Sequence, residues 1–252
     1  SKTKIPTKKK KTNIFDKLIN TQKLSAKVKI YQFKHKKFTG KNLIANMELT
    51  SKQIKLKELF VNSCNGTLKV FAEIDHGKVD NSFQLKVNAS KVDVQKFLYA
   101  FDNFKSKSIT NNSIRGQLSL QANITGKEHN GTIKNKALNG TFNFQLTNGA
   151  FIDFKPIENV GKHVFPKRDF KNISIDQLKG DVTIKNGLFT VAPMQINTSV
   201  IKMDVEGDYG MNGGTELNID VHLRNPDKDK KDISKTVVAE NRKKGVSIHL
   251  QV

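Results

Sequence analysis

Residues 24–30, Leu-Ser-Ala-Lys-Val-Lys-Ile, place an apolar side chain at every second position. Successive side chains of a β-strand point to opposite faces, so this spacing predicts a strand with one buried face. Lys27 and Lys29 then lie on the other face. The fold follows from how often this pattern recurs.

The same alternation returns along the rest of the chain and implies about a dozen strands. A weak repeat of one hairpin unit, seen in residues 139–151 and 180–189, favours a sheet that grows by adding strands over a closed globule. We therefore predict a mainly β protein with an elongated antiparallel meander. The further segments with this alternation are 43–49, 68–74, 83–89, 114–124, 142–146, 182–184, 201–205, 217–223 and 246–252.

Six Asn-Gly pairs lie between these segments. Asn and Gly adopt the positive φ that tight hairpin turns require. We therefore expect consecutive strands to be antiparallel neighbours joined at these pairs. The pairs occupy residues 65–66, 130–131, 139–140, 148–149, 186–187 and 212–213.

Two segments break the strand period and predict one or two short helices. Ser90 is the expected N-cap of an amphipathic helix near residues 91–102. Pro156 is expected to open a second helix that ends at about His163, at the end of the sheet. The apolar residues of the first helix have helical spacing and are Val94, Phe97, Leu98 and Phe101.

The net charge of +21 attracts anionic partners, among them phospholipid headgroups, lipopolysaccharide and nucleic acid. Charge alone does not choose among them. The lysines are spread along the polar phase of nearly every strand, whereas the 16 Phe and 3 Tyr mostly occupy the apolar phase. Because single-stranded nucleic acid needs exposed aromatic side chains beside basic groups, we expect no specific nucleic-acid binding.

Residues that could carry chemistry do not converge. The six histidines are scattered, and Cys64 is the only cysteine, which excludes an intramolecular disulfide and a cysteine-based metal site. Asp75 and His76 precede a predicted turn, but no serine in a nucleophile elbow accompanies them. We therefore predict no catalytic residue, no metal and no cofactor, and a protein that is not an enzyme. No stretch approaches the roughly 18 consecutive apolar residues of a membrane span.

Residues 138–157 run from a strand through an Asn-Gly pair toward a short helix, residues 170–189 add the next hairpin, and residues 192–207 contain Ala-Pro-Met-Gln-Ile-Asn-Thr-Ser. These stretches resemble the C-terminal region of the AsmA-like family of bacterial envelope proteins. Residues 24–125 are similar to the preceding part of those proteins. The motifs are degenerate β patterns rather than an active-site signature.

The resemblance implies a non-enzymatic periplasmic protein that takes part in phospholipid transport and outer-membrane biogenesis. It implies a curved, groove-like or taco-like sheet whose apolar concave face shelters lipid acyl chains, with an envelope lipid as partner. Members of the family usually begin with a transmembrane helix that this chain lacks. We therefore expect a tether to the inner membrane in a segment absent from this chain.

Three parts are expected along the chain. Residues 1–22 form a basic, flexible tail or linker, because their lysine run lacks compensating acidic residues over its first twelve positions. Residues 23–126 form a β-rich segment that contains the first helix. Residues 127–252 form the AsmA-like C-terminal β region.

Apolar-phase positions in the second half are the candidate lining of the lipid groove. Alternation would equally produce a closed sandwich core, in which these residues pack on each other. The basic face either draws the protein to an anionic membrane surface or only keeps it in solution. A structural scaffold that binds an anionic polymer or membrane surface through its basic face is the alternative function. The candidate lining residues are Leu118, Leu120, Phe142, Phe144, Val182, Ile184, Met203 and Val205.

Overall fold

The computed structural model describes residues 23–106, 109–155, 157–158, 170–210, 214–222 and 247–251. Within these residues, 13 strands form one sheet. The strands are β1 Leu24–His35, β2 Phe38–Leu49, β3 Gln53–Ser63, β4 Gly66–Asp75, β5 Asn81–Asp93, β6 Ile114–His129, β7 Thr132–Ile133, β8 Asn139–Ile152, β9 Asn172–Lys185, β10 Leu188–Asn197, β11 Lys202–Gly210, β12 Thr215–His222 and β13 Ser247–Gln251. The described helices are α2 Val94–Ala100 and the 3-10 turns η1 Asp102–Lys105 and η2 Asn135–Ala137.

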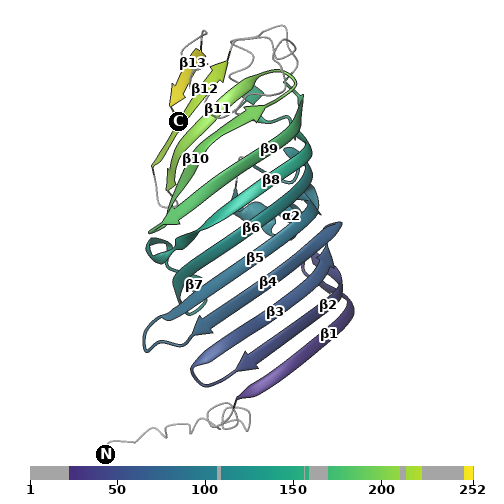
Figure 1. Ribbon diagram of the computed structural model, residues 1–252, viewed down its shortest axis with the longest axis vertical. Coiled ribbons are helices and arrows are strands. Elements are labelled where there is room, and N and C mark those ends of the chain that lie inside the picture. The colour runs from purple at the N-terminus through teal and green to yellow at the C-terminus, as the bar shows by residue number, and fades with distance from the viewer. Residues whose placement is uncertain are drawn as a thin grey trace, which may run out of the picture.

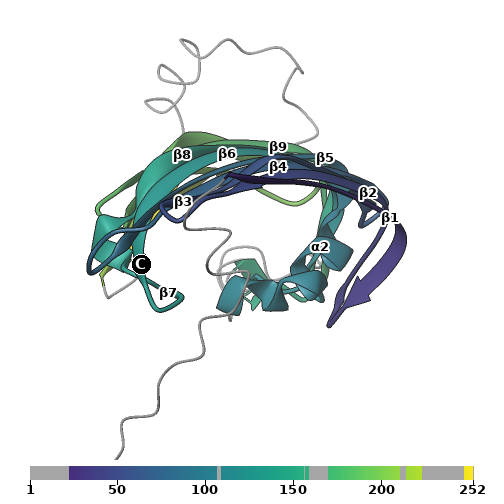
Figure 2. The same ribbon diagram turned by 90° about the horizontal axis from the view of Figure 1, so that it is seen from below.

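The strands pair antiparallel in chain order, except that the short β7 pairs only with β6, and β6 pairs on to β8 (Figure 1). The sheet is open and curls into an arch, with α2 beneath the arch (Figure 2). Among the described residues no second sheet packs against it, so they do not form a sandwich. The predicted fold class, an elongated and curved antiparallel meander of about a dozen strands, is confirmed.

The register of the sheet collects the apolar side chains on one face. Directly paired residues form an unbroken series of nine apolar positions, one on each of β1–β6 and β8–β10, which we call the apolar row. A slip of one residue in any strand would turn its apolar side chains to the opposite face, so burial of this face fixes the register. The apolar row consists of Val28, Ala45, Leu59, Val70, Val87, Ala122, Phe142, Val182 and Val191.

The first predicted helix is shorter than expected, and its predicted cap is wrong. Asp93 is the N-cap of α2, and its carboxylate accepts a hydrogen bond of 3.1 Å from the backbone N–H of Lys96. Ser90 instead lies in β5, opposite Thr67. β5 continues through an irregularity between Ala89 and Val92, which carries the strand past the residue where the sequence predicted it to end.

The Asn-Gly pairs have two different roles. Those at 130–131 and 186–187 form two-residue hairpin turns, and the pair at 65–66 lies at the turn between β3 and β4. The pairs at 139–140 and 148–149 lie inside β8, so the prediction of turns there is wrong. Asn148 has a φ of 50° and sits where the pairing with β6 shifts, so it marks an irregularity within a strand.

Several predictions fall wholly or partly outside the described residues. These are the basic tail 1–22, the Asn-Gly pair 212–213 and most of the second helix, of which Lys155, Ile157 and Glu158 are described as helical. The expected division at residues 126 and 127 falls inside β6.

Candidate lipid-binding face

The apolar face of the sheet is its concave face. α2 lies beneath the arch (Figure 2), and its Phe97 joins a buried cluster with Val61 of β3 and Leu68 of β4. These two strand residues share the face of the apolar row, since each lies two residues from the row member on its own strand, Leu59 on β3 and Val70 on β4. The row therefore lies on the concave face of the arch.

All eight candidate lining residues lie on this concave face. Leu118 and Leu120 of β6 are opposite Leu146 and Phe144 of β8. Further along the sheet, direct partners join Phe142 with Val182, Ile184 with Gly140, Met203 with Val221 and Val205 with Ile219. Val182, Ile184 and Met203 are buried, and the other five are half-buried.

The end of the concave face nearest α2 is covered. Val94 and Leu98 of α2 join a buried cluster that includes Leu146 of β8 and Ile173 of β9. Ile173 has no exposed surface. This end therefore supplies a core that holds the arch together.

The middle of the concave face is not covered to the same degree. Its half-buried members of the apolar row are Leu59, Val70, Val87, Ala122 and Phe142. Leu59 packs against the cluster that contains Phe97 of α2. No second sheet of described residues packs against these strands. An apolar surface of this kind is suited to an apolar ligand.

An aromatic cluster extends this surface onto the helix. Neighbouring ring centroids lie 5.0–5.7 Å apart within it. Phe104 is 60% exposed, so part of the cluster faces water. The sequence predicted the helix but not these contacts, because β1, β2 and η1 each contribute rings. The rings are Phe33, Phe38, Phe97, Phe101 and Phe104.

A model of the AsmA family matches residues 2–194, which is more than half of the chain. The chain belongs to the AsmA family. Membership indicates a function related to the cell envelope and its outer membrane. No curated protein and no solved structure matches the chain.

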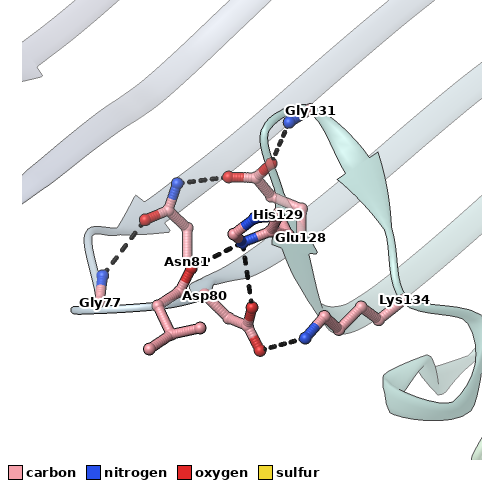
Figure 3. A network of polar contacts seen from close by, with 8 residues as sticks. Gly77, Asp80, Asn81, Glu128, His129, Gly131 and Lys134 are labelled. Carbon is pink, nitrogen blue, oxygen red and sulfur yellow. Dashed lines mark hydrogen bonds and ion pairs between the residues drawn. The ribbon is translucent and has the colours of Figure 1, made fainter.

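The rim of the AsmA-family arch opposite α2 is held by polar contacts between the β4–β5 loop and the β6–β7 hairpin (Figure 3). Lys134 Nζ donates to Asp80 Oδ2 at 2.6 Å, and this ammonium lowers the pKa of the Asp80 carboxyl. His129 Nδ1 lies 2.8 Å from the Val79 carbonyl oxygen and 3.4 Å from Asp80 Oδ1. The contacts fasten two loops that are far apart in sequence, which sequence patterns do not reveal.

The described residues lack two further features. No helix among them is sufficiently long and apolar to traverse a bilayer. They contain no group of three or more His, Cys, Asp or Glu side chains placed to hold a metal ion.

Proposed function

We propose that this AsmA-family chain is a non-enzymatic periplasmic module that handles phospholipid during transport and outer-membrane biogenesis. Its concave face binds the acyl chains. Five of the eight candidate residues are half-buried and contact the lipid, and the three buried ones support the lining from below; the five are Leu118, Leu120, Phe142, Phe144 and Val205, and the three are Val182, Ile184 and Met203. The observation that supports the proposal is the apolar row, which continues without a polar residue through nine strands.

The dimensions and energies suit this role. Strands lie about 4.8 Å apart, so eight intervals give the row a length of about 38 Å. The hydrocarbon core of a bilayer is about 30 Å thick, so the row exceeds the length of an acyl chain from one leaflet. Each buried CH₂ contributes about 0.8 kcal/mol, and a ten-carbon contact therefore contributes about 8 kcal/mol before ordering costs. A ligand held by such uniform contacts can shift along the face without losing them all.

The proposal is tested with matched double variants. Val87→Asp with Ala122→Asp places two carboxylates in the middle of the apolar row, where Val87 and Ala122 are direct partners. Asn88→Asp with Asn123→Asp adds the same charge to exposed positions one residue further along the same strands, on the convex face. Each purified protein is checked by circular dichroism, and phospholipid in its organic extract is quantified by mass spectrometry.

Stoichiometric phospholipid is expected on the parent and on the convex variant, with a loss of most of it from the folded concave variant. Desolvating a carboxylate against an acyl chain is unfavourable, which is the reason for the loss. Absence of lipid from the parent, or equal retention by both variants, would contradict the proposal.

Photo-crosslinking gives a second readout that needs no charge on the concave face. A benzophenone amino acid replaces Phe142, which is half-buried on the concave face, or Thr141, which is exposed on the convex face. Crosslinks to phospholipid are expected from position 142 and not from position 141. Equal crosslinking at both positions would indicate lipid adsorbed without regard to the face.

A further inference from the structure

The convex face carries a shallow depression of about 560 Å³ over β3–β6 and β8. It lies on the side of the sheet opposite the apolar row, because Lys69, Lys86 and Gln121 alternate with row residues along their strands. We call it the basic depression. Its charged lining residues are three lysines, Lys57, Lys69 and Lys86, and one carboxylate, Glu58. Its neutral polar lining includes Asn88, Gln121 and Asn123, and Thr141 and Asn143 lie at its β8 edge.

Two lysines of the basic depression are available to an anion. Lys69 and Lys86 are exposed, and within the part of the chain that the structure describes neither has a carboxylate partner. Lys57, in contrast, forms an ion pair of 2.6 Å with Glu48. The Nζ of Lys86 lies 5.6 Å from the centroid of the Phe71 ring, a cation-π contact that holds its ammonium over the depression.

The lysines continue into two rows of polar side chains that run across the strands. Lys69 is followed by Asn88 and Gln121, and Lys86 by Asn123 and Thr141, each a direct partner of the one before. The side chains of these two asparagines, the glutamine and the threonine are exposed. Among the described residues they have no hydrogen-bond partner. An amide both donates and accepts hydrogen bonds, so the rows match a ligand rich in hydroxyl groups as well as negative charge.

We propose that the basic depression binds an anionic polysaccharide. Lys69 and Lys86 contact its carboxylate or phosphate groups, and the amide rows contact its hydroxyls. A flat bilayer fits this surface less well, because a convex arch meets a plane over a narrow area, whereas an extended polymer can follow the rows across the strands. The site is on the opposite face from the lipid-binding face, so this inference is independent of the proposed function.

The test measures binding of fluorescein-labelled polygalacturonate to the full chain by fluorescence anisotropy at low and moderate salt. Lys69→Gln with Lys86→Gln removes two charges from the depression. Lys27→Gln with Lys29→Gln removes two charges from exposed positions of β1 and is the matched control. Circular dichroism verifies that each variant remains folded.

The Lys69/Lys86 variant is expected to bind about tenfold more weakly than the parent, since two charged contacts are lost. The Lys27/Lys29 control should stay within about twofold of the parent, because nonspecific charge alone changes binding little at moderate salt. Equal weakening in both variants would overturn the proposal by showing attraction to net charge alone.

Substitutions of neutral amide side chains test the polar rows without changing the net charge. Asn88→Ala with Gln121→Ala is expected to weaken polygalacturonate binding about threefold, through two lost hydrogen bonds to hydroxyls. Gln32→Ala with Asn172→Ala, at exposed positions outside the depression, should leave the affinity unchanged. Retained affinity in the first pair would overturn the role of the amide rows.

Binding to vesicles of phosphatidylcholine with phosphatidylglycerol tests whether an anionic membrane surface, rather than a polysaccharide, is the partner. Little binding is expected, with no difference between the parent and the Lys69/Lys86 variant. Tight vesicle binding that depends on Lys69 and Lys86, without binding of polygalacturonate, would assign the depression to a membrane surface and overturn the proposal.

Discussion

Phe144 of β8 lies directly opposite Gly180 of β9, and a Cβ added to Gly180 would lie 2.5 Å from Cε1 of the Phe144 ring. The ring therefore occupies the space that a side chain on its partner would need. Two other cross-strand pairs repeat the arrangement. They are Phe33 with Gly40, at 2.6 Å, and Phe83 with Gly126, at 2.7 Å.

Gly180→Ala is expected to lower the free energy of unfolding by about 1–3 kcal/mol, because the added methyl group overlaps the Phe144 ring. Urea denaturation measures the change. In a Phe144→Leu background the same substitution should cost clearly less, since the overlapping ring is absent. An equal cost in both backgrounds would show that the ring is not the cause.

Ile173→Ala is expected to destabilise the protein by about 2–5 kcal/mol, because it leaves a cavity in a cluster where this side chain is fully buried. Ile133→Ala, at a side chain that is 50% exposed, makes the same chemical change and should cost less than about 0.5 kcal/mol. Thermal unfolding of the two variants under one buffer condition compares them. Similar losses would contradict the placement of the core beside α2.

Asp93→Ala is expected to reduce stability by about 0.5–2 kcal/mol, because the carboxylate that caps α2 is lost. Ser90→Ala should have a small effect, since Ser90 is exposed within β5. The denaturation midpoints of the two alanine variants show which residue caps α2, Asp93 as in the structure or Ser90 as the sequence predicted. A larger effect at Ser90 would reverse that assignment.

Asp80→Asn is expected to lower the melting temperature at neutral pH and to have little effect in acid. The Lys134 ammonium lowers the pKa of Asp80 in the folded protein. A lowered pKa contributes stability above the unfolded value, and this contribution is lost as the pH falls through the folded value. Melting curves of parent and variant from pH 7 downward should therefore converge. A difference in melting temperature that stays constant with pH would show that the ion pair does not cause the stability difference.

The sequence predicted the meander because most strands keep the apolar alternation without interruption. β3 and β10 are absent from the predicted segments for a physical reason. Their pairing shifts between Leu56 and Leu59 and between Val191 and Met194, so apolar residues on one face are three positions apart there. An extra residue in a strand keeps the buried face but breaks the period of two.

The candidate face could be predicted only in part. Alternation placed Phe142 and Val182 in the apolar phase, but it could not decide between an open arch and a sandwich, which requires the three-dimensional path of the sheet. No local sequence pattern indicates the basic depression either, because its residues come together only when the strands pair. Phe71 and Lys86 meet through pairing of β4 with β5, and Thr141 arrives from β8.

The order of the strands has a consequence for how the chain folds. Among the described residues, successive strands along the path from β1 to β13 are hydrogen-bonded in the order in which they are made, and only the two-residue β7 lies off this path. During synthesis each strand can therefore pair as soon as it leaves the ribosome, without waiting for a distant partner. Such local pairing keeps loop-closure costs low and favours rapid folding from the N-terminal end. The growing edge is then the last strand made, and it stays open until the next one arrives.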